Sequence, residues 1–327
     1  MVNERVGYID FMKVMGMFCI VLGHFFPGLG LSSFLYSFNV PIFFMISGYL
    51  CTKKYAYKVL ISKLIPMIII LFSISIIRYP TVVDRFDGEL NFLQYIIGIL
   101  KGKFEYLGTF WFVYTLILNR IIHNFLLNRN RLQIVFSFMC ILTLLILRNL
   151  YTIQDYPLAS YAVLLTFPFF EFGYYINRKD LINYNYINKS TKILLIVLCF
   201  SLILIYVIGW FNGIPYIYNN YYGKSILLLT LTSFVGFFVC KLLAQKMSLI
   251  SGPKVKKIVN IMSRANIIVL GFHGYLIVYF NLIFEGINGL YLCLFQVFAS
   301  IMIMILFIPV DIVYCKYIEP ILFKIKF

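Results

Sequence analysis

Apolar runs, each near the length of a helix that crosses a bilayer, divide the whole sequence. A transmembrane α-helix needs about 20 predominantly apolar residues. Runs of this kind lie at 8–27, 33–51, 60–77, 106–122, 132–148, 158–176, 191–211, 225–243, 265–284 and 289–314. A shorter apolar stretch at 91–100 fits an interfacial or re-entrant piece within a longer loop. The pattern predicts an all-α polytopic integral membrane protein with about ten transmembrane helices.

The amino-acid composition points to lipid as the main solvent. Hydrophobic residues make up 62% of the chain and charged residues 12%, against about 45–50% and about 25% in soluble domains. A transmembrane β-barrel would instead show alternating segments of about ten residues, which this sequence lacks. No repeat or appended soluble segment is apparent, so we expect one membrane-embedded domain over 1–327.

The formal net charge of +16 raises the question of nucleic-acid binding, but the distribution of the charge excludes it. Cytoplasmic loops of membrane proteins are enriched in Lys and Arg. With both termini placed in the cytoplasm, only six of the 28 basic residues fall outside: Arg78, Arg85, Lys101, Lys103, Arg148 and Lys224. We therefore expect cytoplasmic termini, a multi-pass protein of a bacterial plasma membrane surrounded by its lipids, and no nucleic-acid partner.

Ionisable residues inside a membrane span are costly and are functional candidates by default. The first run carries Asp10, Lys13 and His24. At about 100° per residue, spacings of 3 and 11 place all three on one side of a helix, with Lys13 and His24 about 16 Å apart along it. This predicts a polar track. The alternatives without a functional role are that the side chains of Asp10 and Lys13 extend to the cytoplasmic membrane interface and that His24 forms a hydrogen bond with a backbone carbonyl group.

Further polar residues lie in later spans. His273 stands between Gly271 and Gly274, which would let a helix or a substrate approach closely. Its alternative role is a structural hydrogen bond to a neighbouring helix. Glu171 would orient a basic group or simply pair with one. Asp311 is expected to pair with Lys316 or with another span, and His123 is expected to be solvated.

The second span and the loop after it form another candidate region. PIFFMISGYL contains Ser47 and Gly48, a small pair that permits tight packing. The basic loop CTKKYAYKVLISKLIP follows it, and would bind acidic lipid heads or the phosphates of a nucleotide-like donor, or merely mark the inner surface. The seven cysteines form no CxxC pair, and no spacing indicates a metal site.

The opening YIDFMKVMGMFCIVLGH, with Lys13 and His24, resembles the start of the acyltransferase-3 family of integral membrane acyltransferases, which has a basic residue and a histidine in its first span. The later similar segments, in the family's order, are FNVPIFFMISGYL, SKLIP, FWFVY with Trp111, FPFFEFGYYI and SRANIIVLGFH. The resemblance covers nearly the whole chain.

The resemblance implies transfer of an acyl group, usually acetyl from acetyl-CoA, to a hydroxyl of a surface glycan or of its lipid-linked sugar precursor. His24 would be the family's essential histidine and Lys13 its basic partner. Many members carry two arginines three residues apart at the third span. Here Lys63 matches the second, Leu60 stands at the first, and Lys58 would substitute. Acetyl-CoA or another acyl-CoA would be a donor substrate, with no bound cofactor and no metal.

Chemically, such an enzyme must activate a hydroxyl and stabilise an oxyanion. His24 would be the general base; Lys13 would steer the donor and Asp10 would hold Lys13. Trp111, Ser47 and His273 are the candidates for the oxyanion partner. Donor and acceptor would meet within the membrane, or both would bind from the cytoplasm. The main alternative function is an exporter of polysaccharide or lipid-linked sugar, and a third is a non-catalytic sensor or scaffold.

Overall fold

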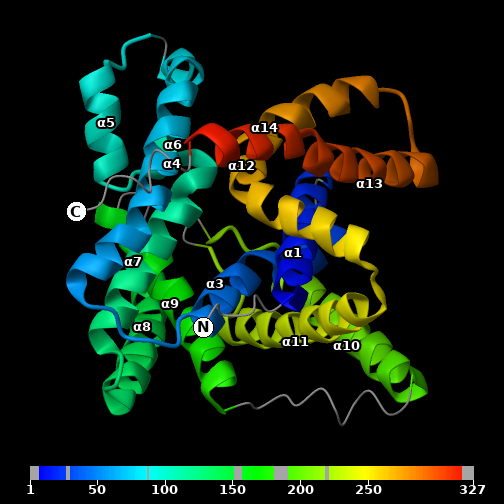
Figure 1. Ribbon diagram of the computed structural model, residues 1–327, viewed down its shortest axis with the longest axis horizontal. Helices are drawn as coiled ribbons and strands as arrows, with labels where there is room; N and C mark the ends of the chain where they lie inside the picture. Colours follow the sequence, from blue (N-terminus) through cyan, green and yellow to red (C-terminus); the bar gives the residue numbers. More distant parts are fainter. Residues whose placement is uncertain are drawn as a thin grey trace. The chain divides into compact units, whose positions relative to one another are not determined.

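The computed structural model describes residues 7–26, 30–86, 88–150, 157–179, 191–217 and 221–318. Within these ranges the regular structure is helical (Figure 1), with Tyr216 and Tyr221 as isolated bridge residues. This confirms the all-α prediction. The α-helices are α1 Gly7–Phe25, α2 Leu31–Tyr36, α3 Asn39–Leu50, α4 Tyr57–Val83, α5 Phe92–Leu100, α6 Phe104–Leu107, α7 Trp111–Leu126, α8 Asn130–Leu150, α9 Ser160–Lys179, α10 Thr191–Asn212, α11 Ile226–Ile250, α12 Pro253–Ile283, α13 Gly289–Leu306 and α14 Ile308–Val313. Shorter helical turns are η1 Asp84–Phe86, η2 Gly108–Phe110, η3 Pro157–Ala159 and the π-helical η6 Tyr314–Ile318.

Eight segments of the described chain are long and apolar enough to cross a membrane. They are Gly7–Phe25, Leu31–Leu50, Tyr57–Phe86, Asn130–Leu147, Lys192–Asn212, Ile226–Ile250, Pro253–Ile283 and Gly289–Val313. The two remaining predicted spans correspond to α7, with 16 residues, and α9, with 20 residues. The membrane protein is thus polytopic, while the count of ten stays a prediction. The chain termini lie outside the described residues.

The chain forms two compact units. The first unit contains residues 1–46, 180–216 and 222–321, and the second contains 47–179, 217–221 and 322–327. The chain passes from one unit to the other within α3, after Ile46. The residues predicted to be functional therefore have to be described separately for each unit.

The first unit is organised around α1, which packs against α11 and α12 and also contacts α2 and α13 (Figure 1). Small residues allow these close contacts: a Cβ atom on Gly23 would lie 3.1 Å from the ring of Tyr36. Polar side chains inside the unit bond to helix carbonyl groups, as Gln296 does to the carbonyl of Phe25 at 3.1 Å. Such bonds satisfy groups that lipid could not.

The second unit packs α4 against α7, and α7 and α8 against α9 (Figure 1). Gly48, at the end of α3, lies directly on α9, since a Cβ atom there would be 1.8 Å from the carbonyl oxygen of Phe170. The predicted small pair therefore does serve tight packing. Arg78, counted with the outer segments, lies buried near the end of α4, and its Nη1 donates to the carbonyl of Leu107 at 2.8 Å. It therefore lies in a helix and not in a loop.

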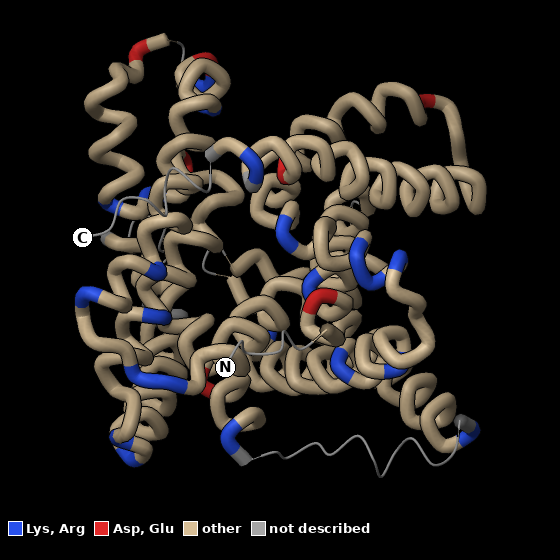
Figure 2. Tube along the Cα trace, in the orientation of Figure 1, with Lys and Arg blue, Asp and Glu red and all other residues tan. Residues whose placement is uncertain are grey.

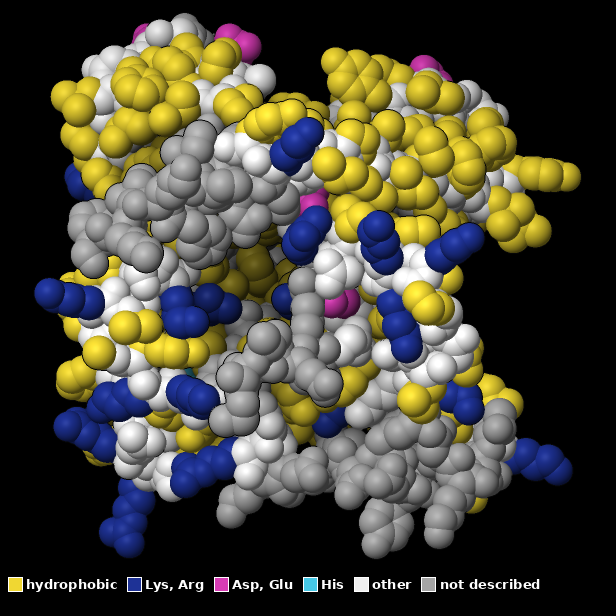
Figure 3. Space-filling view, viewed as in Figure 1, with side chains coloured by type: hydrophobic (Ala, Val, Ile, Leu, Met, Phe, Trp, Pro, Cys, Tyr) yellow, Lys and Arg dark blue, Asp and Glu magenta, His cyan; other side chains and the backbone are white. Residues whose placement is uncertain are grey.

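Large apolar side chains cover the outer faces of helices in both units (Figure 3). On α5 the exposed ones include Leu93 and Leu100, and on α13 they include Leu290 and Phe298. In the second unit, basic residues gather at the start of α4 and the end of α7, and acidic residues at the turn between α4 and α5 (Figure 2). Apolar surfaces of this extent are typical of contact with lipid.

Candidate functional site

A pair of histidines lies in the first unit, near the end of α1. The rings of His24 on α1 and His273 on α12 have centroids 5.0 Å apart. The hydroxyl of Tyr36, on α2, lies 2.8 Å from Nδ1 of His24. His24 is exposed, whereas His273 is buried. The structure therefore brings together two histidines that are 249 positions apart in the sequence (273 minus 24).

The hydrogen bonds of His273 define its neutral tautomer. Its Nδ1 lies 3.0 Å from the carbonyl oxygens of both Val269 and Leu270. Carbonyl oxygens only accept, so Nδ1 carries the proton, and in the neutral ring Nε2 keeps its lone pair. Both carbonyl groups belong to α12 itself, whereas the structural role considered for His273 was a bond to a neighbouring helix. These bonds fix the ring beside His24.

Asp10 and Lys13 lie at the other end of α1. Asp10 is buried and accepts hydrogen bonds from the side chains of Ser263 at 2.7 Å and Asn260 at 3.3 Å, both on α12. The backbone carbonyl of Lys13 accepts a bond from Asn266 at 2.9 Å. At a rise of about 1.5 Å per residue, Lys13 lies about 16 Å and Asp10 about 21 Å from His24 along the helix. They dock α1 against α12 and do not join the histidine pair.

A basic pocket lies in the second unit at the start of α4. It contains about 340 Å³ of space and is lined by Cys51, Lys53, Tyr55, Leu60, Lys63, Leu64, Arg120, His123 and Asn124. The ammonium group of Lys63 lies 4.7 Å from the centre of the Tyr55 ring. Lys63, from the predicted motif, is thus in the pocket, whereas Lys58 is exposed outside its lining. Three cations around one space favour an anionic ligand such as a phosphate.

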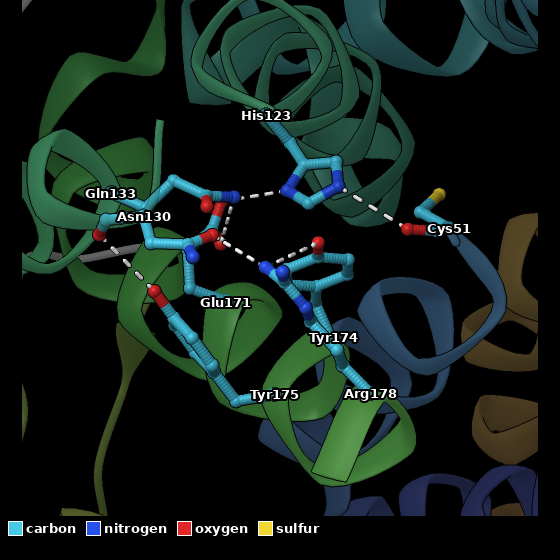
Figure 4. A network of polar contacts seen from close by, with 8 residues as sticks. All are labelled: Cys51, His123, Asn130, Gln133, Glu171, Tyr174, Tyr175 and Arg178. Atoms are coloured by element: carbon cyan, nitrogen blue, oxygen red, sulfur yellow. Dashed lines mark hydrogen bonds and ion pairs between the residues drawn. The ribbon is translucent and has the colours of Figure 1, made fainter. Parts of the chain in front are cut away.

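Glu171 belongs to a buried network beside this pocket (Figure 4). Its Oε1 lies 2.7 Å from Nδ1 of His123, and its Oε2 accepts a bond from Gln133 at 3.0 Å. Glu171 thus pairs with a basic group. The expectation that His123 is solvated was wrong, because its side chain is 3% exposed. It is buried because α9 and α8 supply the partners that the sequence alone does not place next to α7.

Two predicted residues occupy other positions in the second unit. Ser47 is buried on α3, and Trp111 is buried at the first position of α7 with its ring against Phe112. Both belong to the second unit, and the histidine pair belongs to the first. Outside this set, Asp311 pairs with Arg264 of α12 at 3.1 Å, so its partner is another span. Among the described residues, no group of three His, Cys, Asp or Glu forms a metal site.

Comparison with known families decides the identity. A family model described as an acyltransferase domain, that of the acyltransferase-3 family, matches residues 6–314. The chain belongs to this family. It is a membrane acyltransferase, and the acyl group that it transfers is not an aminoacyl group. No curated protein and no solved structure matched the chain.

In this acyltransferase, three residues beside the predicted ones were missed by the reasoning from sequence. Tyr36 bonds to His24, Arg120 lines the basic pocket, and His123 pairs with Glu171. Arg120 and His123 lie near the end of an apolar run, so the rule that ionisable residues inside a span are functional candidates could have found them. Tyr36 gave no such signal, because tyrosine is frequent in this chain and carries no charge.

Proposed function

We propose that this acyltransferase transfers an acyl group, most simply acetyl from acetyl-CoA, to a hydroxyl of a cell-surface glycan or of its lipid-linked precursor in a bacterial plasma membrane. The observation that carries the chemistry is the exposed His24, bonded to Tyr36 and placed beside His273. An imidazole that is reachable and held in one orientation is suited to remove a proton from a hydroxyl near neutral pH.

The reaction follows from this arrangement. With the proton of Nδ1 donated to the hydroxyl oxygen of Tyr36, Nε2 of His24 has a free lone pair and takes the proton of the acceptor hydroxyl. The acceptor oxygen bonds to the thioester carbonyl carbon, the carbon–sulfur bond breaks, and the proton passes from His24 to the leaving thiolate. His273 stands beside this proton transfer as a second imidazole.

The basic pocket supports a separate part of the proposal, the recognition of the donor. Lys53, Lys63 and Arg120 line it, and cationic side chains of this kind bind phosphate groups strongly. The pocket is too small for a whole acyl-CoA, so it would hold the phosphate-bearing end of that molecule. Asp10 and Lys13 are then positioning residues that dock α1 against α12.

Two lysines at the start of α4 provide a matched test of the donor pocket. Lys63→Ala should raise KM for acetyl-CoA about tenfold with little change in kcat, because one charge-assisted contact is lost. Lys58→Ala removes a lysine from the same stretch of helix but not from the pocket lining, and should leave KM nearly unchanged. Equal effects of the two substitutions would contradict the assignment. Release of free CoA by purified protein in lipid nanodiscs is the measurement.

The chemical step is tested by His24→Ala in the same assay. Loss of a general base lowers turnover by about 10²–10⁴-fold, and KM for acetyl-CoA should change little because donor binding is assigned to other residues. Turnover within threefold of the wild-type value, at equal amounts of folded protein, would rule out His24 as the base.

A further inference from the structure

The loop that joins α3 to α4, residues 51–56, forms one wall of the basic pocket, to which it contributes Cys51, Lys53 and Tyr55. Neighbouring residues near the end of α7 hold this loop. The side chain of Asn124 accepts from the backbone N–H of Tyr55 at 2.8 Å and donates to its carbonyl at 3.1 Å. At the start of the loop, Nε2 of His123 lies 3.3 Å from the carbonyl oxygen of Cys51 (Figure 4).

The partners of His123 show how its ring is used. The carbonyl oxygen of Cys51 can only accept, so Nε2 carries a hydrogen and donates to the loop. Oε1 of Glu171 lies 2.7 Å from Nδ1, and Gln133 donates to Oε2 of the same side chain at 3.0 Å. The ring therefore joins Glu171 of α9 to the loop.

The surroundings keep this ring from turning. His123 and Glu171 are each 2% exposed, and Gln133 is fully buried. The ring centre of His123 lies 5.1 Å from that of Phe170 and 4.8 Å from that of Tyr174, so aromatic rings pack against the imidazole. Burial of two such polar groups has a desolvation cost that their mutual contact offsets only in part, so we assign the pair to holding a defined geometry and not to adding stability.

We propose that His123, held by Glu171, is a positioning residue that fixes the loop 51–56 and through it the affinity for the anionic donor. This inference rests on the proposed donor pocket. It assigns no chemical step to His123 or Glu171; their part is to keep Lys53 and Tyr55, and with Tyr55 the stacked Lys63, in the geometry that an anion requires.

The same two helices offer a matched control about one turn away. Nδ2 of Asn119, on α7, donates to the hydroxyl of Thr166, on α9, at 2.8 Å. Both side chains are buried. Asn119→Ala therefore removes a polar link between α7 and α9, as a change at His123 would, without touching the loop.

Substitutions at His123 and Glu171 separate the link to the loop from the pairing of the two helices. In His123→Asn the amide nitrogen takes the place of Nδ1 and still donates to Glu171, so the buried carboxylate keeps a partner. The shorter side chain has no atom in the place of Nε2, so the bond to Cys51 is lost. In Glu171→Gln the amide can donate to Nδ1 and accept from Gln133, so a neutral His123 still donates to Cys51. Glu171→Ala should behave like His123→Asn, because the ring is no longer held.

The first readout is the alkylation of Cys51 by N-ethylmaleimide, measured peptide by peptide by mass spectrometry on the full chain in nanodiscs. Cys51 is half-buried, so its rate reports opening of the loop. We expect a rise of about tenfold in His123→Asn and Glu171→Ala, and rates near the wild-type value in Glu171→Gln and Asn119→Ala. The second readout is kinetic: KM for acetyl-CoA should rise about tenfold in the first two variants with kcat nearly unchanged.

Three results would overturn the inference. The first is an unchanged rate of Cys51 labelling in His123→Asn, which contradicts the positioning of the loop whatever the donor is. The second is a fall in kcat at constant KM, which would mean that the pair acts in the chemistry. The third is an equal rise of KM in Asn119→Ala, which would mean that the pair acts through general stability. Absence of turnover in the wild-type protein with any acyl-CoA would instead contradict the proposed function. The rate of Cys51 labelling would then still test whether His123 positions the loop.

Discussion

At the scale of single residues, the account depends on how His24 is oriented. Its Nδ1 has Tyr36 as hydrogen-bond partner at 2.8 Å, so only Nε2 remains for an acceptor hydroxyl. Tyr36→Phe removes this bond and keeps the ring. One hydrogen bond of ordinary strength corresponds to about threefold to tenfold in rate, so we expect kcat to fall by that factor with KM for acetyl-CoA unchanged.

The control for Tyr36→Phe is Tyr216→Phe. The ring centre of Tyr216 lies 6.2 Å from that of Tyr36, so this variant probes the aromatic surroundings but not the bond to His24. Release of CoA by both variants measures the difference. A Tyr36→Phe enzyme as fast as the Tyr216→Phe enzyme would show that the hydroxyl does not orient His24.

Part of this site was predictable from single residues and part was not. His24 and His273 were predicted because an ionisable group in an apolar run has to be explained by function or by a partner. Their contact was not predictable, since it depends on how α1 packs against α12. Tyr36 is one of 26 tyrosines, and no spacing rule links it to a histidine on another helix.

At the scale of helices, glycine decides where two backbones can approach. Gly48→Ala would place a Cβ atom 1.8 Å from the carbonyl oxygen of Phe170, and the backbone of α9 cannot yield cheaply. Such overpacking typically costs about 1–3 kcal/mol or more. We expect a clear fall in the thermal unfolding temperature of the detergent-solubilised protein.

Gly274→Ala is the matched control, because a Cβ atom at Gly274 would meet nothing within 4 Å. In a helix interior, alanine is favoured over glycine by roughly 0.5–1 kcal/mol, so this variant should be as stable as the wild type or slightly more stable. If both glycine variants unfold at the same temperature, the close packing of α3 on α9 is not as described.

The helix boundaries show what hydropathy can and cannot predict. The apolar run 60–77 lies within the longer helix α4, Tyr57–Val83. The run 265–284 corresponds to the second part of α12, Pro253–Ile283. The hydrogen bonds of a helix continue past the apolar stretch wherever polar residues can still reach water or protein. Proline at the first position of a helix lacks only a bond that the helix would not make, and Pro253 stands there in α12. Apolar length therefore predicts the span, and not the end of the helix.

At the scale of the whole molecule, the open question of topology concerns α7 and α9. If both cross the bilayer, ten spans place Arg129 in the cytoplasm and Leu158 outside. If only the eight long apolar segments cross it, the two positions change sides. The distribution of basic residues favours ten spans, and we predict that arrangement.

Single cysteines at these positions, in a chain without its own cysteines, test the topology in intact cells. Arg129→Cys should be protected from a membrane-impermeant maleimide and Leu158→Cys should react; both native side chains are exposed. Lys54→Cys and Glu89→Cys are controls, since both arrangements place the first inside and the second outside. Reaction at position 129 together with protection at 158 would establish eight spans.

The family, the helical class and the membrane setting could all be read from the sequence, because apolar length and ordered motifs are local properties. The division of the predicted residues between two compact units could not, since it results from long-range packing. His24 and His273 lie in one unit, and Lys63 and Glu171 in the other. Donor recognition and proton transfer are therefore tested separately here, each by variants in its own unit.

The most direct test of the central claim is the acyl content of the surface glycan. Wild-type protein and His24→Ala would be produced at equal membrane levels in a strain that lacks the native gene, and ester-linked acyl groups on the purified glycan measured by NMR. We predict acyl esters with the wild type and none with the variant. Glycan that reaches the surface only with the wild-type protein, and never carries an acyl ester, would contradict the account and favour an exporter.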